Sequence, residues 1–295
     1  MSGPETHRGV LVGVDRSASS MAAVDWAARD AAMRNVPLTL MHVIAPVVPA
    51  LAPWPEIPIP QDYFEQQEDR ARRILEDARR VVADSTADHP PPLVHSAVVH
   101  GPAVSTLVNE SKIADLMVVG CRGEGAFGQA SFGSVSTGLV NYAHCPVAVV
   151  HDEAPTPAAA PVLVGIDGSH ASERATEIAF DEASRRGVDL VALHAWSDVS
   201  LSEVPGLDFE AMEVQAQDAL AAWLARWQER YPGVTVRRVV VRDEPARQLV
   251  EHSESAQLVV VGSSGRGGFA GMLLGSVSTA VTHAARTVVI VAREP

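Results

Sequence analysis

The chain has 295 residues, which is too long for one typical hydrophobic core and suits two domains of about 150 residues each. Hydrophobic residues make up 47% and charged residues 20%, proportions that exclude a disordered chain and are typical of a globular protein. The formal net charge of -13 disfavours binding to nucleic acid or to an anionic membrane surface, because both of these ligands are themselves negative.

No segment predicts export or membrane insertion. The first residues, MSGPETHRG, are polar and lead into a strand without the apolar core of a secretion signal. The apolar run over 36–52 is interrupted by prolines and is too short to span a bilayer. The arginine-rich stretch over 70–80 also carries acidic residues, which predicts a solvated helix face. The chain has two cysteines, Cys121 and Cys145, too few for a disulfide framework, so we expect a reducing, cytoplasmic location.

Apolar runs and amphipathic stretches alternate along the chain. In the first half, strands are predicted over 9–14, 38–44, 93–100, 116–120 and 146–151. Helices are predicted to begin near Ser17, Gln61, Ala103 and Ser134, with Ser17 and Ser134 suited to N-capping. Strands rich in Val, Leu and Ile and separated by helices predict a parallel sheet that is covered on both faces.

The second half of the chain repeats the first. Gly13, Asp15 and His42 align with Gly165, Asp167 and His194 at an offset of 152, and Gly120 and Ser134 align with Gly262 and Ser276 at an offset of 142. Duplication at this scale predicts an α/β protein with two tandem Rossmann-like domains, over 1–153 and 158–295. Each is expected to be a five-stranded parallel sheet with helices on both faces. The Ala/Pro-rich segment HDEAPTPAAAP joins them.

Each predicted fourth strand is followed by a glycine-punctuated loop that runs into a helix. The loops GCRGEGAFGQASFGS and GSSGRGGFAGMLLGS share the template G-x-x-G, nine residues, then G-S. Glycines let the backbone approach an anion closely, and the N–H groups that open the next helix point at it with the helix dipole behind them. The serine hydroxyls at positions 134, 136, 276 and 278 can add further donors. Two such loops at identical spacing predict two phosphate-binding sites.

Two other phosphate-binding motifs are excluded. The match GEGAFG follows the fourth predicted strand, whereas a dinucleotide fingerprint belongs on the first strand-to-helix turn. A Walker A loop needs a lysine, and Lys112, the only lysine in the chain, precedes the strand. The phosphate charge must therefore be met by backbone amides, by Arg122 or Arg266, and by Mg²⁺.

An aspartate ends the first strand of each copy, in VGVD at Asp15 and in VGID at Asp167. At the carboxyl edge of the sheet, this carboxylate can accept a hydrogen bond from a ribose hydroxyl or from an adenine amino group. The pattern D-x-S is also a good start for the following helix, so the carboxylate can instead cap that helix. The two roles are compatible.

With these motifs, nearly the whole chain resembles a tandem universal stress protein of the mycobacterial and actinobacterial type. The family's ATP-binding loop has the pattern G-2x-G-9x-G-S/T, which both copies match. The resemblance implies an adenine nucleotide alpha hydrolase-like fold, a cytoplasmic ATP-binding regulator of stress or dormancy, a homodimer and an unknown regulatory protein partner. The first implied ATP site comprises Gly13, Asp15, Val43, Gly120, Gly123, Gly133, Ser134, Val135 and Ser136. The second comprises Gly165, Asp167, Ala195, Gly262, Gly265, Arg266, Gly275, Ser276, Val277 and Ser278.

Nothing in the sequence predicts a catalytic base or nucleophile beyond the phosphate cradle. His42 and His194 close the second predicted strands and are expected to be structural. The main hypothesis is thus a non-catalytic ATP-binding protein. The alternatives are a slow ATPase or other adenylate-processing enzyme, and an interaction scaffold whose sites bind nothing.

Three further expectations concern individual residues. The fifth strands, PVAVVH and TVVIVA, are short and apolar, so we expect their edges to be paired between the domains. Valine at Gly120 or Gly262 is expected to abolish binding while the domain stays folded. Because Arg266 replaces Glu124 at matching loop positions, we expect the second site to bind the triphosphate more tightly.

Overall fold

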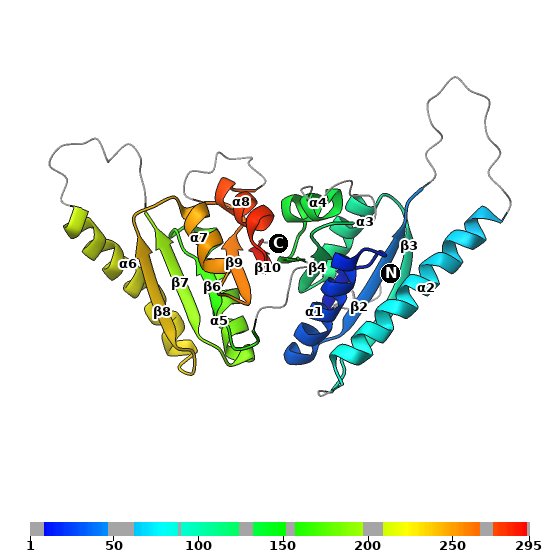
Figure 1. Cartoon of the computed structure of the whole chain (residues 1–295), viewed down its shortest axis with the longest axis horizontal. Helices are drawn as coiled ribbons and strands as arrows, with labels where there is room; N and C mark the ends of the chain where they lie inside the picture. The colour runs from blue at the N-terminus through cyan, green and yellow to red at the C-terminus, as the bar shows by residue number, and fades with distance from the viewer. Residues whose placement is uncertain are drawn as a thin grey trace, which may run out of the picture. The chain divides into compact units, whose positions relative to one another are not determined.

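The computed structural model describes residues 9–46, 62–87, 90–123, 132–151, 157–196, 209–265 and 274–293 (Figure 1). Within these ranges the chain forms alternating strands and helices. The chain divides into two compact units, Met1–His144 and Cys145–Pro295.

The first unit contains a sheet of four parallel strands in the order β3-β2-β1-β4. Its elements are β1 (Val10–Gly13), α1 (Ala18–Arg34), β2 (Leu38–Ile44), α2 (Tyr63–Ser85), β3 (Val94–His100), α3 (Ala103–Glu110), the 3₁₀ turn η1 (Ser111–Ile113), β4 (Leu116–Gly120) and α4 (Ser134–Tyr142). The chain steps from β1 to β2 to β3 in one direction and then crosses back to β4. Right-handed crossovers therefore place α1 and α2 on one face of the sheet and α3 and α4 on the other.

The second unit contains five parallel strands in the order β10-β9-β6-β7-β8. Its elements are β5 (Val147–Val150), β6 (Val162–Gly165), α5 (His170–Arg186), β7 (Leu190–Ala195), α6 (Phe209–Arg230), β8 (Val236–Val241), α7 (Pro245–Ser253), β9 (Leu258–Gly262), α8 (Ser276–Ala284) and β10 (Val288–Ala292). Strand β5 lies antiparallel to β10, with Ala148 opposite Ile290. The predicted pairing of these two terminal strands is confirmed, but both belong to the second unit, so the first unit keeps four of the five strands that were predicted for it.

Burial explains why these residues form central strands. Val10, Leu11 and Val12 of β1 are fully buried, as are Val289 and Ile290 of β10, which is the pattern of a sheet covered on both faces. The predicted α/β fold with two tandem Rossmann-like halves is therefore confirmed.

Helix caps follow the sequence pattern at α1 and differ from it at α4. Ser17 caps α1 by accepting a hydrogen bond from the Ser20 amide, as predicted, and Asn35 in the left-handed conformation ends the helix. The prediction that Ser134 caps α4 is wrong, because Ser134 is the first helical residue and Gly133 holds the cap position.

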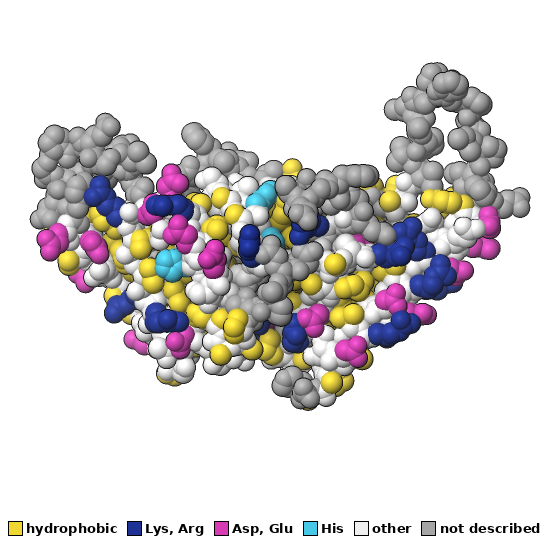
Figure 2. All heavy atoms as spheres, in the orientation of Figure 1, with side chains coloured by type: hydrophobic (Ala, Val, Ile, Leu, Met, Phe, Trp, Pro, Cys, Tyr) yellow, Lys and Arg dark blue, Asp and Glu magenta, His cyan; other side chains and the backbone are white. Residues whose placement is uncertain are grey.

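The surface of α2 is charged with both signs, as the stretch over 70–80 predicted. Arg72 pairs with Glu68 and Asp69, and Arg80 pairs with Asp77, all on exposed side chains. Figure 2 shows the alternating dark blue and magenta side chains along this helix. Among the described residues, no helix combines the length and the apolar character needed to cross a membrane.

Candidate functional site

Each unit has a cavity at the carboxyl ends of its strands, where the strand order reverses. In the first unit this point lies between β1 and β4, and in the second it lies between β6 and β9. Ligands of open α/β sheets bind at such switch points. The cavity volumes are about 620 Å³ in the first unit and about 360 Å³ in the second.

The described residues predicted for each ATP site come together around these cavities. The first cavity is lined by Gly13, Asp15, Val43, Gly120, Gly123, Gly133, Ser134, Val135 and Ser136. The second is lined by Gly165, Asp167, Ala195, Gly262, Gly265, Gly275, Ser276, Val277 and Ser278. Arg266 and Glu124 lie outside the described residues, so the expected difference in affinity between the sites stays a prediction.

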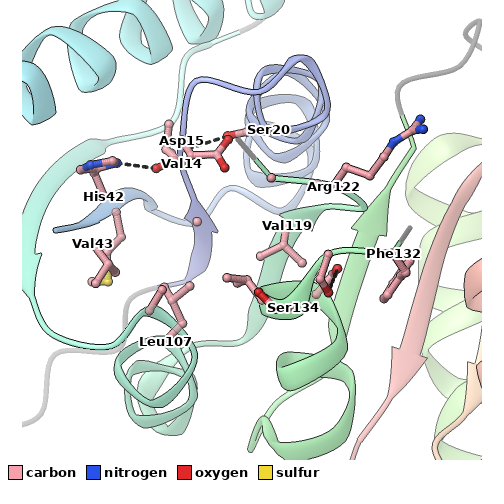
Figure 3. A pocket seen from close by; sticks show the side chains of 18 residues that line it. Val14, Asp15, Ser20, His42, Val43, Leu107, Val119, Arg122, Phe132 and Ser134 are labelled. Atoms are coloured by element: carbon pink, nitrogen blue, oxygen red, sulfur yellow. Dashed lines mark hydrogen bonds between the residues drawn. The ribbon is translucent and has the colours of Figure 1, made fainter. Parts of the chain in front are cut away.

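The first cavity has an apolar end beside Val43 and Leu107, and its other end is built from the glycine loop and the start of α4. In Figure 3, His42 and Val43 lie at one end and Arg122 and Phe132 at the other. Leu107 contributes a further apolar wall from α3, the helix that covers this face of the sheet. The apolar end suits a flat base, and the end built from the loop and the start of α4 suits phosphates.

One oxygen of the aspartate that follows the first parallel strand of each unit, β1 or β6, accepts hydrogen bonds within the turn before the next helix. Oδ1 of Asp15 accepts hydrogen bonds from the Ser17 amide over 2.8 Å and from its hydroxyl over 2.5 Å. Oδ1 of Asp167 accepts the same pair from Ser169, over 2.9 and 2.6 Å. The carboxylate therefore holds the turn that precedes each helix, whereas the helix cap that was predicted for it is provided by Ser17 and Ser169.

The second oxygen of each aspartate faces the glycine loop. A Cβ built on Gly123 would lie 3.0 Å from Asp15 Oδ2, and one built on Gly265 would lie 2.9 Å from Asp167 Oδ2. The carboxylate and the second glycine of the loop thus meet at the cavity wall in both units. A larger residue at this glycine would crowd the carboxylate.

The two ends of each glycine loop are joined by hydrogen bonds. The Gly133 amide donates to the Cys121 carbonyl over 2.8 Å, and the Gly275 amide donates to the Ser263 carbonyl over the same distance. The hydroxyl of buried Ser136 donates to the Cys121 carbonyl over 3.1 Å. In the second unit, the Ser278 hydroxyl donates to the Gly262 carbonyl, one residue before the carbonyl that matches that of Cys121. Because these two hydroxyls donate to main-chain carbonyls, the exposed Ser134 and Ser276 are the better placed hydroxyl donors for a ligand.

The helices that follow these loops begin without a side-chain cap. Gly133 and Gly275 hold the cap positions of α4 and α8, and a glycine has no side chain with which to accept from the first amides. By contrast, α1 and α5 are capped by Ser17 and Ser169. The first turns of α4 and α8 therefore suit an anion at the cavity wall.

The first glycine of each loop has a packing role that the sequence did not indicate. A Cβ on Gly120 would lie 2.6 Å from the Ser19 carbonyl carbon in α1, and one on Gly262 would lie 2.8 Å from that of Ala171 in α5. Neither glycine has a positive φ. Valine at these positions would force a helix to move, so the structure indicates a loss of stability beside the predicted loss of binding.

The matching histidines of the two repeats, His42 and His194, have the structural role that was expected. Nδ1 of His42 lies 2.7 Å from the Val14 carbonyl oxygen, and Nδ1 of His194 lies 2.7 Å from that of Ile166. Each ring thus joins the carboxyl ends of two neighbouring strands.

Sequence reasoning missed several apolar and hydroxyl residues of the cavities. The first cavity also includes Ser20, Met41, Ala103, Leu107 and Val119, and the second includes their counterparts Ser172, Leu193, Pro245, Leu249 and Val261. The members of each pair are separated by the same offsets, 152 or 142, as the residues that were predicted. The duplication itself could therefore have found them.

No cluster of His, Cys, Asp or Glu that could hold a metal ion occurs in the part of the chain that the structure describes. Among its described lining residues, each cavity instead offers one carboxylate, Asp15 or Asp167. A divalent cation there would have to be held jointly with a phosphate ligand.

Comparison with known proteins agrees with this arrangement. The profile of the universal stress protein family matches residues 6–151 and 160–293. Universal stress protein Rv2623 of Mycobacterium tuberculosis is 57% identical over 297 aligned residues, covering 100% of this chain and 99% of the relative. A universal stress protein of Mycolicibacterium smegmatis is 52% identical over 290 residues, covering 98% of each chain.

Solved structures show the same fold. The crystal structure of a universal stress protein from Archaeoglobus fulgidus superposes with a TM-score of 0.70 at 21% identity, covering 98% of this chain and 99% of that one. With two matched domains and relatives that align along the whole chain, this protein belongs to the universal stress protein family.

Proposed function

We propose that the chain binds ATP with Mg²⁺ in each of its two cavities and acts as a non-catalytic, nucleotide-dependent regulator of a stress or dormancy response. The observation that carries this proposal is the repetition of one constellation in both units. An aspartate, a glycine loop closed by an amide-to-carbonyl hydrogen bond, and a helix capped by glycine surround each cavity. A packing requirement alone does not explain why both helices begin beside a cavity without a side-chain cap.

The lining side chains support binding rather than hydrolysis. Among the described lining residues of the first cavity, the titratable side chains are Asp15, His42 and Arg122, and in the second the only one is Asp167. Oδ1 of each aspartate is held by an N–H and an O–H group, and His42 is held by a strand carbonyl. A general base for water attack would need a side chain poised beside the terminal phosphate.

The first experiment identifies the nucleotide that the protein carries. The purified chain is denatured, and the released small molecules are separated by chromatography and identified by mass spectrometry, with an Asp15→Ala/Asp167→Ala double variant as the control. We expect an adenine nucleotide from the native chain and much less from the double variant. Equal amounts from both proteins, or none from either, would contradict the proposal.

A second experiment separates binding from slow hydrolysis. The native chain is incubated with ATP and Mg²⁺ for hours, and the bound and free nucleotides are then quantified. We expect the bound nucleotide to remain ATP. Conversion to ADP that disappears in the double variant would favour an enzyme instead. The predicted homodimer and the regulatory protein partner are part of the same proposal, since a nucleotide-dependent regulator must present its bound state to another molecule.

A further inference from the structure

The loop that follows β4 is held to α1 at Arg122, the second residue of the loop. The hydroxyl of Ser19 donates to the Arg122 carbonyl over 2.6 Å, and the hydroxyl of Ser17 lies 3.2 Å from the same oxygen. Ser19 is 1% exposed and lies in the first turn of α1, where its backbone packs on Gly120. Because Ser19 belongs to a helix that packs on the sheet, this contact holds the start of the loop relative to the sheet.

The second unit lacks this contact. Ala171 occupies the position that matches Ser19, since a Cβ on Gly262 would lie 3.0 Å from the Ala171 Cβ just as one on Gly120 would lie 2.7 Å from Ser19 Oγ. The matching loop carbonyl, that of Ser264, accepts from the Ser169 hydroxyl over 3.4 Å. At this position the second loop is therefore held to the cap residue of α5 by a longer hydrogen bond than the one that holds the first loop to α1.

Holding the Arg122 carbonyl also orients an amide of the phosphate loop. The carbonyl of Arg122 and the N–H of Gly123 belong to one planar trans peptide unit, so they point in opposite directions. With the carbonyl directed at the hydroxyls of α1, the Gly123 amide is directed away from that helix. Gly123 lines the cavity beside Asp15. Ser19 therefore fixes the direction of an amide in the wall that faces the ligand.

We propose that Ser19 is a positioning residue for phosphate binding: it pre-orients the Arg122–Gly123 peptide, so that nucleotide leaves the first site more slowly than it would with alanine at this position. The inference rests on the proposed ATP binding and adds a determinant that the second site lacks. A pre-oriented donor loses less conformational entropy when the ligand binds. The resulting gain in affinity appears mainly as a slower dissociation rate.

The test measures dissociation from one site at a time. Asp167→Ala silences the second site, radiolabelled ATP is bound with Mg²⁺, and its release is followed after an excess of unlabelled ATP is added. Loss of one hydrogen bond predicts that Ser19→Ala raises the dissociation rate about two- to tenfold, with a smaller effect on the association rate. An unchanged dissociation rate would overturn the positioning role, even if Ser19→Ala lowered the melting temperature of the protein.

The reciprocal variant is the matched control. In an Asp15→Ala background, which leaves the second site, Ala171→Ser adds the missing hydroxyl and should slow dissociation by a similar factor. Slower release with Ala171→Ser supports the inference independently of any folding defect in Ser19→Ala, and equal or faster release contradicts it. If neither single-site background binds ATP, the proposed function itself fails. That outcome is distinct from binding that these two substitutions leave unchanged.

Discussion

Nδ1 of His42 lies 2.7 Å from the Val14 carbonyl oxygen and, since that oxygen can only accept, this ring nitrogen carries the proton. The hydrogen bond joins the carboxyl ends of β1 and β2 at the edge of the first cavity. We expect His42→Ala to lower the free energy of unfolding by about 1 kcal/mol. ATP affinity at the first site should fall modestly through the displaced Val43 and Asp15. Urea denaturation and ATP titration check this, and a large loss of affinity at unchanged stability would instead indicate direct contact with the ligand.

Substitutions at Gly120 and Gly123 should distinguish an effect on helix packing from an effect on ATP binding. A Cβ on Gly120 would lie 2.6 Å from a backbone atom of α1, whereas one on Gly123 would lie 3.0 Å from a side-chain atom, Asp15 Oδ2. We expect Gly120→Ala to destabilise the protein by about 1–3 kcal/mol through overpacking. Gly123→Ala should leave stability nearly unchanged and weaken ATP binding. Thermal unfolding without nucleotide and calorimetric titration distinguish the two effects.

The second unit offers the same comparison as an internal control. A Cβ on Gly262 would lie 2.8 Å from the Ala171 backbone, and one on Gly265 would lie 2.9 Å from Asp167 Oδ2. Gly262→Ala should therefore lower the stability of the protein, and Gly265→Ala should leave it nearly unchanged. Native stability in both Gly120→Ala and Gly262→Ala would contradict the packing role.

Two substitutions at Asp15 distinguish its hydrogen bond with Ser17 from its proposed contact with ATP. Asn retains an oxygen that can accept from the Ser17 amide, whereas Ala removes it. We expect Asp15→Asn to keep nearly native stability and Asp15→Ala to lose about 1 kcal/mol, as for a lost cap. Both should weaken ATP binding at the first site, because both remove the negative charge. If Asp15→Asn binds ATP as tightly as the native chain, the carboxylate does not act on the ligand.

The buried ion pair of α1 should matter for stability and not for binding. Asp30 is 1% exposed and lies 2.6 Å from the Arg34 guanidinium, one turn along the helix and remote from the residues that line the cavity. Arg34→Ala removes this charge-assisted hydrogen bond, so we expect it to lower the free energy of unfolding by about 2 kcal/mol. When ATP binding is measured about 20 °C below the melting temperature of the variant, its dissociation constant should equal that of the native chain. A matching loss of affinity would show that α1 transmits strain to the site.

The sequence predicted the fold and both cavities because the duplication repeats the same pattern of strands, glycines and aspartates. The packing role of Gly120 could not be predicted, because the G-x-x-G pattern does not say whether a helix or a ligand occupies the space beside a glycine. The difference between Ser19 and Ala171 is visible in the aligned repeats. Its meaning depends on the 2.6 Å contact with the Arg122 carbonyl, which only the three-dimensional structure provides. The pairing of β5 with β10 was expected from their short apolar edges, whereas its antiparallel direction depends on tertiary packing that periodicity does not encode.

The most direct test of the account is a calorimetric titration of ATP with Mg²⁺ into four proteins: the nucleotide-free native chain, Asp15→Ala, Asp167→Ala and the double variant. We predict two binding events per native chain, one per single variant, and none in the double variant, with circular dichroism unchanged throughout. Binding to the double variant with native affinity, or no binding to the folded native chain, would contradict the claim that the two cavities are ATP sites.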